Sequence, residues 1–345
     1  MPGDYFALIR ESAFSTKPAL TDAEWIDIIS ESLQGQHQFD TIQGATHETA
    51  TEEGLGKYMW TGDFQSKLGA TNGIGVVLAN LFGESVDTPE GTPSATPVFQ
   101  HVFSSANAPG YGTVAIPRSV TALASRSNQL EQWNYLGGAV SRLSIEAVIN
   151  QDIRFTPEFV GDVDNTTGVA DTPVAPKVAE YFSHHDSTFK IDIPGAKATD
   201  LDVEAWSIQI EADNTISPNI NTRFGRRTHH GALTITGRVD RDFFDMLYYE
   251  QFYGDAGADS PQDTLTFKDV DIEIVGVATA TGIEAGFDFF ELEIMMPKIK
   301  FMSTEANVTG RERITQGVPF QAFRDPTTTE ALSVLLTNEV AAYPA

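Results

Sequence analysis

The chain contains no cysteine among its 345 residues. Disulfide bonds, thiolate nucleophiles and cysteine-ligated zinc or iron-sulfur sites are therefore all excluded. Positive charge is also scarce, because 22 Lys and Arg stand against 48 Asp and Glu and give a net charge of -26. A surface of this sign repels phosphate backbones, so we expect no conventional nucleic-acid-binding role. The acidity is equally compatible with simple solubility or a salt-adapted host.

Long hydrophobic runs and an export signal are missing too. No apolar run approaches the roughly 20 residues that a membrane-spanning helix needs. The start, Met1-Pro2-Gly3-Asp4, has neither a basic segment nor an apolar core. With 41% hydrophobic residues, the composition predicts a folded protein that is made in a cytoplasm and has no membrane partner. The length favours two domains.

One pattern occurs twice in the sequence. Trp60-Thr61-Gly62-Asp63-Phe64 precedes a helix-like run that ends at Leu81-Phe82-Gly83-Glu84. Ile235-Thr236-Gly237-Arg238-Val239 precedes a second run that ends at Phe252-Tyr253-Gly254-Asp255. The offset is far longer than the periods of roughly 20 to 50 residues found in solenoids and propellers. The pattern therefore indicates a domain duplicated within one chain.

Alternation of apolar and polar residues dominates and predicts a mainly β fold. The runs 143–149 and 153–159, separated by Asn150-Gln151, are typical of an antiparallel strand pair. The run 206–212, a turn near Asn214 and the segment 220–224 predict a second hairpin. Further short strands are expected at 233–235, 265–267, 272–274, 287–289 and 292–294.

Helical signals are few. The capping-box sequence Thr21-Asp22-Ala23-Glu24 predicts an N-terminal helix that reaches Leu33. An apolar stripe over 74–81, closed by Gly83, predicts a second helix. A third is expected to be capped by Asp242 and to end at Gly254.

The predicted architecture is two tandem β-sandwich or barrel-like domains, each with a short helix. A linker is expected where the sequence becomes polar and rich in Asp, Thr and Pro, from 161 to 176. The organisation that we predict is an N-terminal arm with a helix (1–35), a first domain (36–165), a linker (166–185), a second domain (186–310) and a C-terminal arm (311–345).

Few residues suggest chemistry. Adjacent histidines in His184-His185-Asp186 and in His229-His230 would point to opposite faces of a strand, so they chelate one ion poorly. Carboxylate pairs such as Glu291 and Glu293, or Asp271 and Glu273, are expected by chance in so acidic a chain. Nucleotide-binding and hydrolase motifs are missing from the sequence. We therefore expect no catalytic residue, no cofactor and no metal.

Three features together resemble the tail tube proteins, or major tail proteins, of long-tailed bacteriophages. They are the Thr-Gly strand with its helix and aromatic-Gly end, the stretch Tyr135-Leu136-Gly137-Gly138-Ala139-Val140-Ser141-Arg142-Leu143-Ser144-Ile145, and the hairpin expected over 203–224. The resemblance covers roughly residues 36–310. It is one of pattern and order, without a diagnostic motif.

The resemblance implies a structural virion protein that forms rings, which stack into the hollow tail tube through which DNA is ejected. Inner strands of the subunits would close into one large barrel, which removes exposed sheet edges. Because related tubes have six units per ring, two units per chain imply a trimer with pseudo-sixfold symmetry, and a hexamer of a larger single domain is the alternative. Other tail proteins, such as the tape measure and tail terminator, are the implied partners.

The hairpins 140–160 and 204–224 are expected in the tube wall. An acidic lumen would let DNA pass without specific binding. Only one face of each strand can point inward, so some of the candidate carboxylates must face elsewhere. The candidates for the lumen or a subunit interface are Glu146, Asp152, Glu158, Glu204, Glu211 and Asp213. Contacts between stacked rings are expected at the loop 84–97, the linker and both chain ends.

Two other classes of function stay open. A carbohydrate-binding β-sandwich would use exposed aromatic rings, and the candidates are Trp133, Tyr135, Tyr248 and Tyr249. A hydrolase built on the carboxylates and histidines is the weaker alternative.

Overall fold

The protein is mainly β, as the alternation predicts. The computed structural model describes residues 5–20, 23–42, 52–82, 86–89, 98–106, 119–126, 131–167, 181–192, 197–200, 202–218, 222–264, 266–278, 289–306, 314–340 and 343. Within these ranges the chain forms twenty-two strands and two α-helices. Every named pair of strands is antiparallel.

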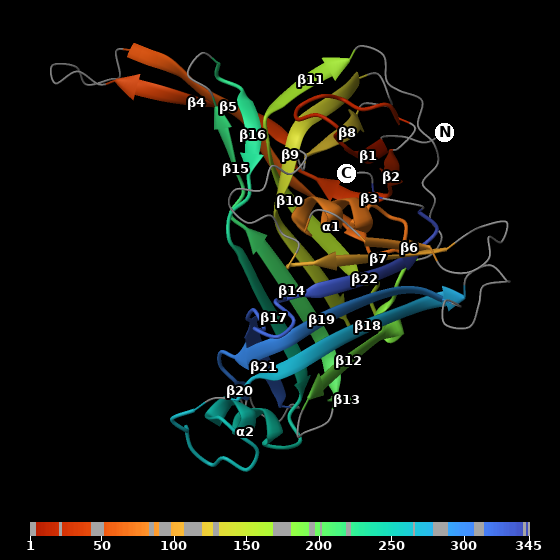
Figure 1. Ribbon diagram of the computed structural model, residues 1–345, viewed down its shortest axis with the longest axis vertical. Coiled ribbons are helices and arrows are strands. Elements are labelled where there is room, and N and C mark those ends of the chain that lie inside the picture. Colours follow the sequence, from red (N-terminus) through yellow and green to blue (C-terminus); the bar gives the residue numbers. More distant parts are fainter. Residues whose placement is uncertain are drawn as a thin grey trace.

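The first layer of the fold combines strands from both halves of the sequence (Figure 1). Apolar and polar residues alternate along these strands, so one face of the layer is buried and the other is accessible. From one edge to the other, the order is β3 (Ile28–Glu31) with β4 (Gln34–Ile42), β5 (Glu52–Lys67), β10 (Arg154–Gly161), β9 (Glu131–Val148), β14 (Val203–Ala212), β17 (Leu233–Asp242) and β21 (Thr315–Ala322).

The second layer packs on the buried face of the first, and in Figure 1 its strands β18, β19 and β22 cross in front of β14 and β17. Isoleucines and leucines of both layers share one apolar core. The order of the second layer is β13 (Lys197–Thr199), β12 (Ser187–Asp192), β18 (Lys268–Ala278), β19 (Phe289–Phe301), β22 (Ser333–Asn338), β7 (Phe99–Ser104) and β6 (Val86–Pro89).

The remaining elements attach to these layers. The N-terminal half of β9 pairs with β8 (Val120–Arg126) and β11 (Val163–Thr167), and β8 leads on to β1 (Tyr5–Arg10) and β2 (Glu24–Ile26). Short pairs are formed by β15 (Thr215–Pro218) with β16 (Gly225–His229), and by β20 (Glu305–Ala306) with β21. The helices are α1 (Ile74–Phe82) and α2 (Leu247–Tyr253).

The two copies of the repeated pattern occupy equivalent places in the first layer. In β5, Gly62 lies opposite Phe159 of β10, and in β17, Gly237 lies opposite Phe320 of β21. Each Thr-Gly strand is followed by a helix. We call β3, β4, β5, α1, β9 and β10 the first unit, and β14, β17, α2, β19, β20 and β21 the second unit.

The sheet is continuous between the two units. Strand β14 of the second unit pairs with β9 of the first from Ala205 opposite Val148 to Glu211 opposite Arg142. Gln209 lies opposite Ser144 near the middle of this junction. The first layer therefore presents one uninterrupted surface that spans both units.

Several local expectations are wrong. The segment expected to form the N-terminal helix instead forms β2 and β3, which pair with β1 and β5. Helix α2 begins after Met246, and Asp242 is the last residue of β17 rather than a cap, although Gly254 ends the helix as expected. The strand 206–212 does not form a hairpin with 220–224, because β9 and β17 flank it.

Other expectations are confirmed or untested. Helix α1 and the strand pair of β9 and β10 form as predicted, with Asn150 in the turn at a φ of 61°. Strand β18 begins at Lys268, so Phe267 precedes it. Gly83, Leu265, Phe287, most of the loop 84–97 and linker residues 168–180 lie outside the described residues.

Candidate functional site

The accessible face of the first layer is a polar surface whose rows follow from the strand register. Directly opposite residues of antiparallel strands share a face, so the register gives its rows. One row holds Thr156, Ser144, Gln209, Thr236 and Gln321. A second row holds Asp63, Glu158, Arg142, Glu211 and Thr234, and a third holds Lys67, Arg154, Glu146, Ser207 and Arg238. Short hydroxyl and amide side chains thus alternate with charged rows.

Arg142 is the centre of the charged row at the junction of the two units. Its guanidinium contacts Glu158 at 2.8 Å on one side and Glu211 at 3.0 Å on the other. The charge of Glu158 is the main cause that raises the pKa of Arg142, and the hydrogen bonds that Arg142 donates to both carboxylates add to it. One arginine therefore joins three strands, β10, β9 and β14, across the boundary between the units.

The other basic groups of this face also have acidic neighbours. Lys67 contacts Asp152 at 2.7 Å, and Arg238 contacts Asp240 at 2.8 Å. Arg154 lies opposite Glu146 in the register. Carboxylates and basic groups therefore occur in near-equal numbers on this face, in contrast to the strongly acidic chain as a whole.

The six candidate carboxylates fall into two sets. Glu146, Glu158 and Glu211 lie on the accessible face, where Arg142 joins Glu158 to Glu211. The other three lie at the margins: Asp152 in the turn after β9, Glu204 at the register shift of β14, and Asp213 exposed just after β14.

Sequence reasoning missed the basic partners, although a signal for them existed. Arg142, Ser144 and Glu146 alternate with the apolar residues of β9, so their common face could be predicted from the period of two. The contact between Arg142 and Glu211 could not, because it depends on the pairing of strands distant in sequence.

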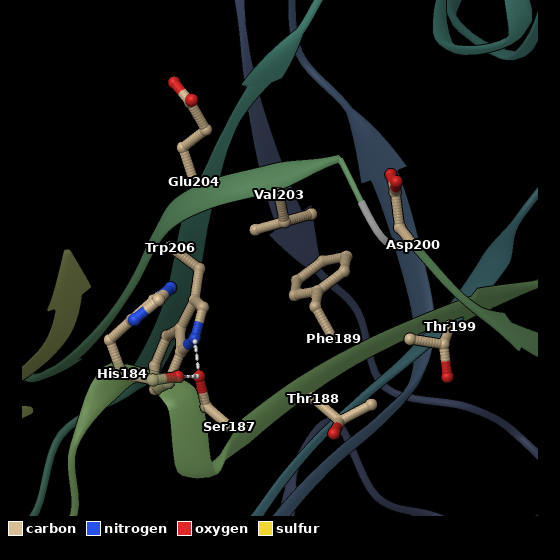
Figure 2. Close-up of a pocket in the computed structure, with 9 residues that line it drawn as sticks. All are labelled: His184, Ser187, Thr188, Phe189, Thr199, Asp200, Val203, Glu204 and Trp206. Atoms are coloured by element: carbon tan, nitrogen blue, oxygen red, sulfur yellow. Dashed lines mark hydrogen bonds between the residues drawn. The ribbon is translucent and has the colours of Figure 1, made fainter. Parts of the chain in front are cut away.

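A small cavity beside β12 and β14 has a volume of about 190 Å³ (Figure 2). The indole of Trp206 donates to the Ser187 hydroxyl at 3.2 Å, and that hydroxyl donates to the His184 carbonyl at 2.7 Å. Asp200 accepts a hydrogen bond from Tyr248 at 2.7 Å. Figure 2 shows Glu204 pointing away from the other residues of the cavity. This space is smaller than the usual ligand pocket of 300 Å³ or more.

The residues considered for metal binding or hydrolysis are arranged differently from expectation. His184–Asp186 forms a 3₁₀ turn rather than part of a strand. Glu273 and Glu293 lie opposite each other, with Lys190 bonded to Glu273. Partial burial, and then the charges of Glu293 and Glu273, raise the pKa of Glu291. Among the described residues, no group of three or more His, Asp or Glu is placed to hold a metal ion.

The aromatic residues considered for sugar binding do not form an exposed surface. Tyr135 and Tyr248 are buried, at 1% and 2% exposure. Trp133 is partly buried, with the Arg126 guanidinium 5.0 Å from its ring. The expectation of four exposed stacking rings is therefore wrong for these two tyrosines.

Sequence comparison gives the family. No helix among the described residues has the length and apolar character needed to span a membrane. No curated protein matches the chain. The family model described as phage tail tube protein matches residues 5–322, which includes both units of the sheet and every strand of the second layer except β22. The chain therefore belongs to the phage tail tube protein family, whose members are structural proteins of the virion tail.

Proposed function

We propose that three copies of this chain close into a ring, with two units per copy and pseudo-sixfold symmetry, and that the rings stack into the tube that conducts DNA. The observation that carries the proposal is the β9–β14 junction, which sets two equivalent units side by side in one sheet. A closed ring continues that arrangement and leaves no open sheet edge. A hexameric ring is the alternative outcome.

In this proposal, the predicted domains 36–165 and 186–310, extended by β3 and β21, supply the two units of the ring. The linker (166–185) and the remaining parts of the N-terminal arm (1–35) and the C-terminal arm (311–345) carry contacts to neighbouring rings. The tape measure and tail terminator proteins are the partners expected inside the tube and at its end. DNA passes through without sequence-specific binding.

The accessible face of the first layer is the surface that we assign to the lumen. Its hydroxyl and amide row offers no fixed positive charge, Arg142 and Arg238 are held in ion pairs, and Arg154 lies opposite Glu146. An arginine neutralised by two carboxylates attracts a phosphate backbone less than a free one, because net local charge sets the attraction. The predicted acidic lumen thus becomes a surface where carboxylates lie beside the basic groups.

Electron microscopy of the purified full chain tests the ring. Stacked rings with a central hole and three chains per ring, measured by native mass spectrometry of single rings, are the expected result. Six chains per ring would replace the trimer with the hexamer. A persistent monomer at high concentration would contradict the tube proposal.

A paired substitution tests the lumen. Glu158→Gln with Glu211→Gln leaves Arg142 without its two carboxylates, so we expect tubes that retain DNA and virions that eject it several-fold more slowly at low salt. The matched control adds Arg142→Gln to the same pair and should restore ejection. Unchanged ejection in the pair variant would show that this face does not contact DNA.

A further inference from the structure

The first layer ends in two edges that have no second strand in the described part of the chain. At one end, β3 and β4 pair with β5 alone. At the other end, β20 pairs with β21 alone. Strand β18 does not reach this edge, because its pairing with β19 stops at Ile299. Open strand edges of this kind are a template for another strand.

The edge formed by β3 and β4 corresponds to β14 of the second unit. Gln34 lies opposite Thr61, and Gln209 lies opposite Thr236, so each glutamine faces the threonine of a Thr-Gly pair. Both ladders also shift register at the same place. The shift falls between Ile28 and Ser30 in β3, and between Val203 and Ala205 in β14. A shared bulge fixes the correspondence residue by residue.

The edge formed by β20 corresponds to the part of β9 that meets β14. Phe159 faces Val140 of β9, and Phe320 faces Phe301 of β19. Three residues before each phenylalanine, Thr156 faces Ser144, and Gly317 faces Glu305. Glu305 therefore occupies the place of Ser144.

The two correspondences meet at the junction within the chain. There, Ser144 lies opposite Gln209. We propose that β20 of one copy pairs with the β3–β4 edge of the next in the same register, so that Glu305 of one copy lies opposite Gln34 of its neighbour. This inference rests on the proposed ring and names the strands and the register that close it. The junction between copies then repeats the junction within each copy.

In the single chain, side chains occupy the backbone groups of this edge at Leu33. Its N–H donates to the Glu31 carboxylate at 3.0 Å, and its carbonyl accepts from the Tyr135 hydroxyl at 2.9 Å and from Arg126 at 3.1 Å. Ile208, the equivalent residue, instead lies in the β9–β14 ladder. These side-chain bonds protect the edge before assembly, and pairing exchanges the Glu31 bond for one to the neighbouring strand.

Disulfide cross-linking tests the register, and the absence of native cysteine makes it clean. Directly opposite strand residues place their Cβ atoms about 4.5–5.5 Å apart, close to the span of a disulfide. Assembled tubes of the Gln34→Cys, Glu305→Cys variant are treated with a mild copper-phenanthroline oxidant and analysed on a non-reducing denaturing gel. We expect a ladder of cross-linked chains that ends at three, and at least tenfold more cross-linking than in an off-register control.

Two controls frame the result. Ser144→Cys with Gln209→Cys should form its disulfide within one chain, whether assembled or not. Gln38→Cys with Glu305→Cys is four strand residues out of register, about 13 Å, and should stay reduced. If the Gln34→Cys, Glu305→Cys variant does not assemble, Gln36→Cys with Ser303→Cys tests the same register two residues further along each strand.

The outcomes separate the inference from the proposed function. The edge pairing would be overturned if tubes form but neither the Gln34–Glu305 pair nor the Gln36–Ser303 pair cross-links, or if the Gln38–Glu305 pair cross-links better. The proposed tube would be unaffected by that result. A wild-type chain that never forms tubes would instead remove the proposed ring.

Discussion

The helices of the two units follow equivalent strands but have different surroundings. All nine residues of α1 are buried, and the helix contacts β1, β7 and β9. In α2, only Tyr248 and Gln251 are buried. Just before α2, Phe244 is 70% exposed and Met246 is 48% exposed. The same position of the fold is therefore core in one unit and surface in the other.

The difference comes from the chain ends. Strand β1 and Tyr343, near the two ends of the chain, pack against α1, and a side chain on Gly75 would collide with the Tyr343 ring. Asn80 of α1 also accepts a hydrogen bond from the Val140 backbone of β9 at 2.8 Å. Backbone pairing thus stays constant between the units, whereas helix side chains adapt to what covers them.

The largest expected effect is on stability, from truncating an aromatic side chain at the end of each helix. Phe82→Ala removes a fully buried ring and should lower the free energy of unfolding by about 3–5 kcal/mol. Tyr253 is the last residue of α2, as Phe82 is of α1, and Tyr253→Ala should cost about 1 kcal/mol or less because this ring is only partly buried. Denaturant unfolding followed by circular dichroism measures both. Equal losses would show that α2 is as covered as α1.

Much of the fold could be predicted from local pattern. Alternation in 143–149 predicts the buried face of β9, since Leu143, Ile145 and Ala147 all lie in the core. The repeated Thr-Gly pair marks equivalent strands because, at both sites, a side chain on the glycine would collide with a neighbouring strand. Because these signals are local in sequence, a single amino-acid sequence is enough to detect them.

Other features depend on partners distant in sequence. Glu24 sits in a capping-box sequence, yet tertiary pairing with β1 makes its segment a strand. The run 206–212 gives no sign that β9 is its neighbour. For the same reason, alternation could place Glu158 and Glu211 on polar faces, but it could not show that Arg142 joins them.

The glycines of the repeat give the next effect. Gly62 has a φ of 146°, and an added Cβ would lie 2.6 Å from the Ser32 carbonyl oxygen. Gly62→Ala should therefore cost about 2–4 kcal/mol, from backbone strain and collision with the backbone of Ser32 and Leu33 between β3 and β4. Gly237→Ala meets only the Phe320 ring and should cost about 1–3 kcal/mol. Thermal unfolding of the two variants compares them, and a larger loss at Gly237 would contradict this ranking.

The start of each helix predicts a difference in pH dependence. Glu24 accepts a hydrogen bond from the Gly73 backbone before α1, and burial raises its pKa from 4.5 to about 8. At the start of α2, the carboxylate that accepts a backbone hydrogen bond is Asp245, from the Leu247 N–H at 3.2 Å, and this side chain is 42% exposed. Between pH 4.5 and 8, the folded chain keeps a proton that the unfolded chain releases, so this group makes stability fall as pH rises.

Glu24→Gln should remove that pH dependence. We expect the free energy of unfolding of the variant to rise by about 1–2 kcal/mol relative to wild type between pH 5 and pH 8. A fully buried group would give about 1.4 kcal/mol for each unit of pKa shift, and the effect is smaller here because the side chain is only partly buried. Unfolding midpoints at several pH values measure the gain. A constant offset between the two proteins across this range would contradict the raised pKa.

The smallest effect concerns the charges at the junction of the units. Arg142→Gln leaves Glu158 and Glu211 unpaired, but all three side chains are about 40% exposed. Solvent screening limits the loss to about 0.5–1 kcal/mol at low salt, and 1 M salt should abolish it. Gln36 in β4 and Ser303 just before β20 stand at the corresponding positions of the two outer edges, so Gln36→Glu with Ser303→Arg builds a matching pair that is separated in the single chain. This second variant should leave the unfolding of the monomer unchanged and should stabilise only the assembled ring, since its two charges meet only when neighbouring copies pair. A change in monomer stability as large as that of Arg142→Gln would mean that the two edges already meet within one chain.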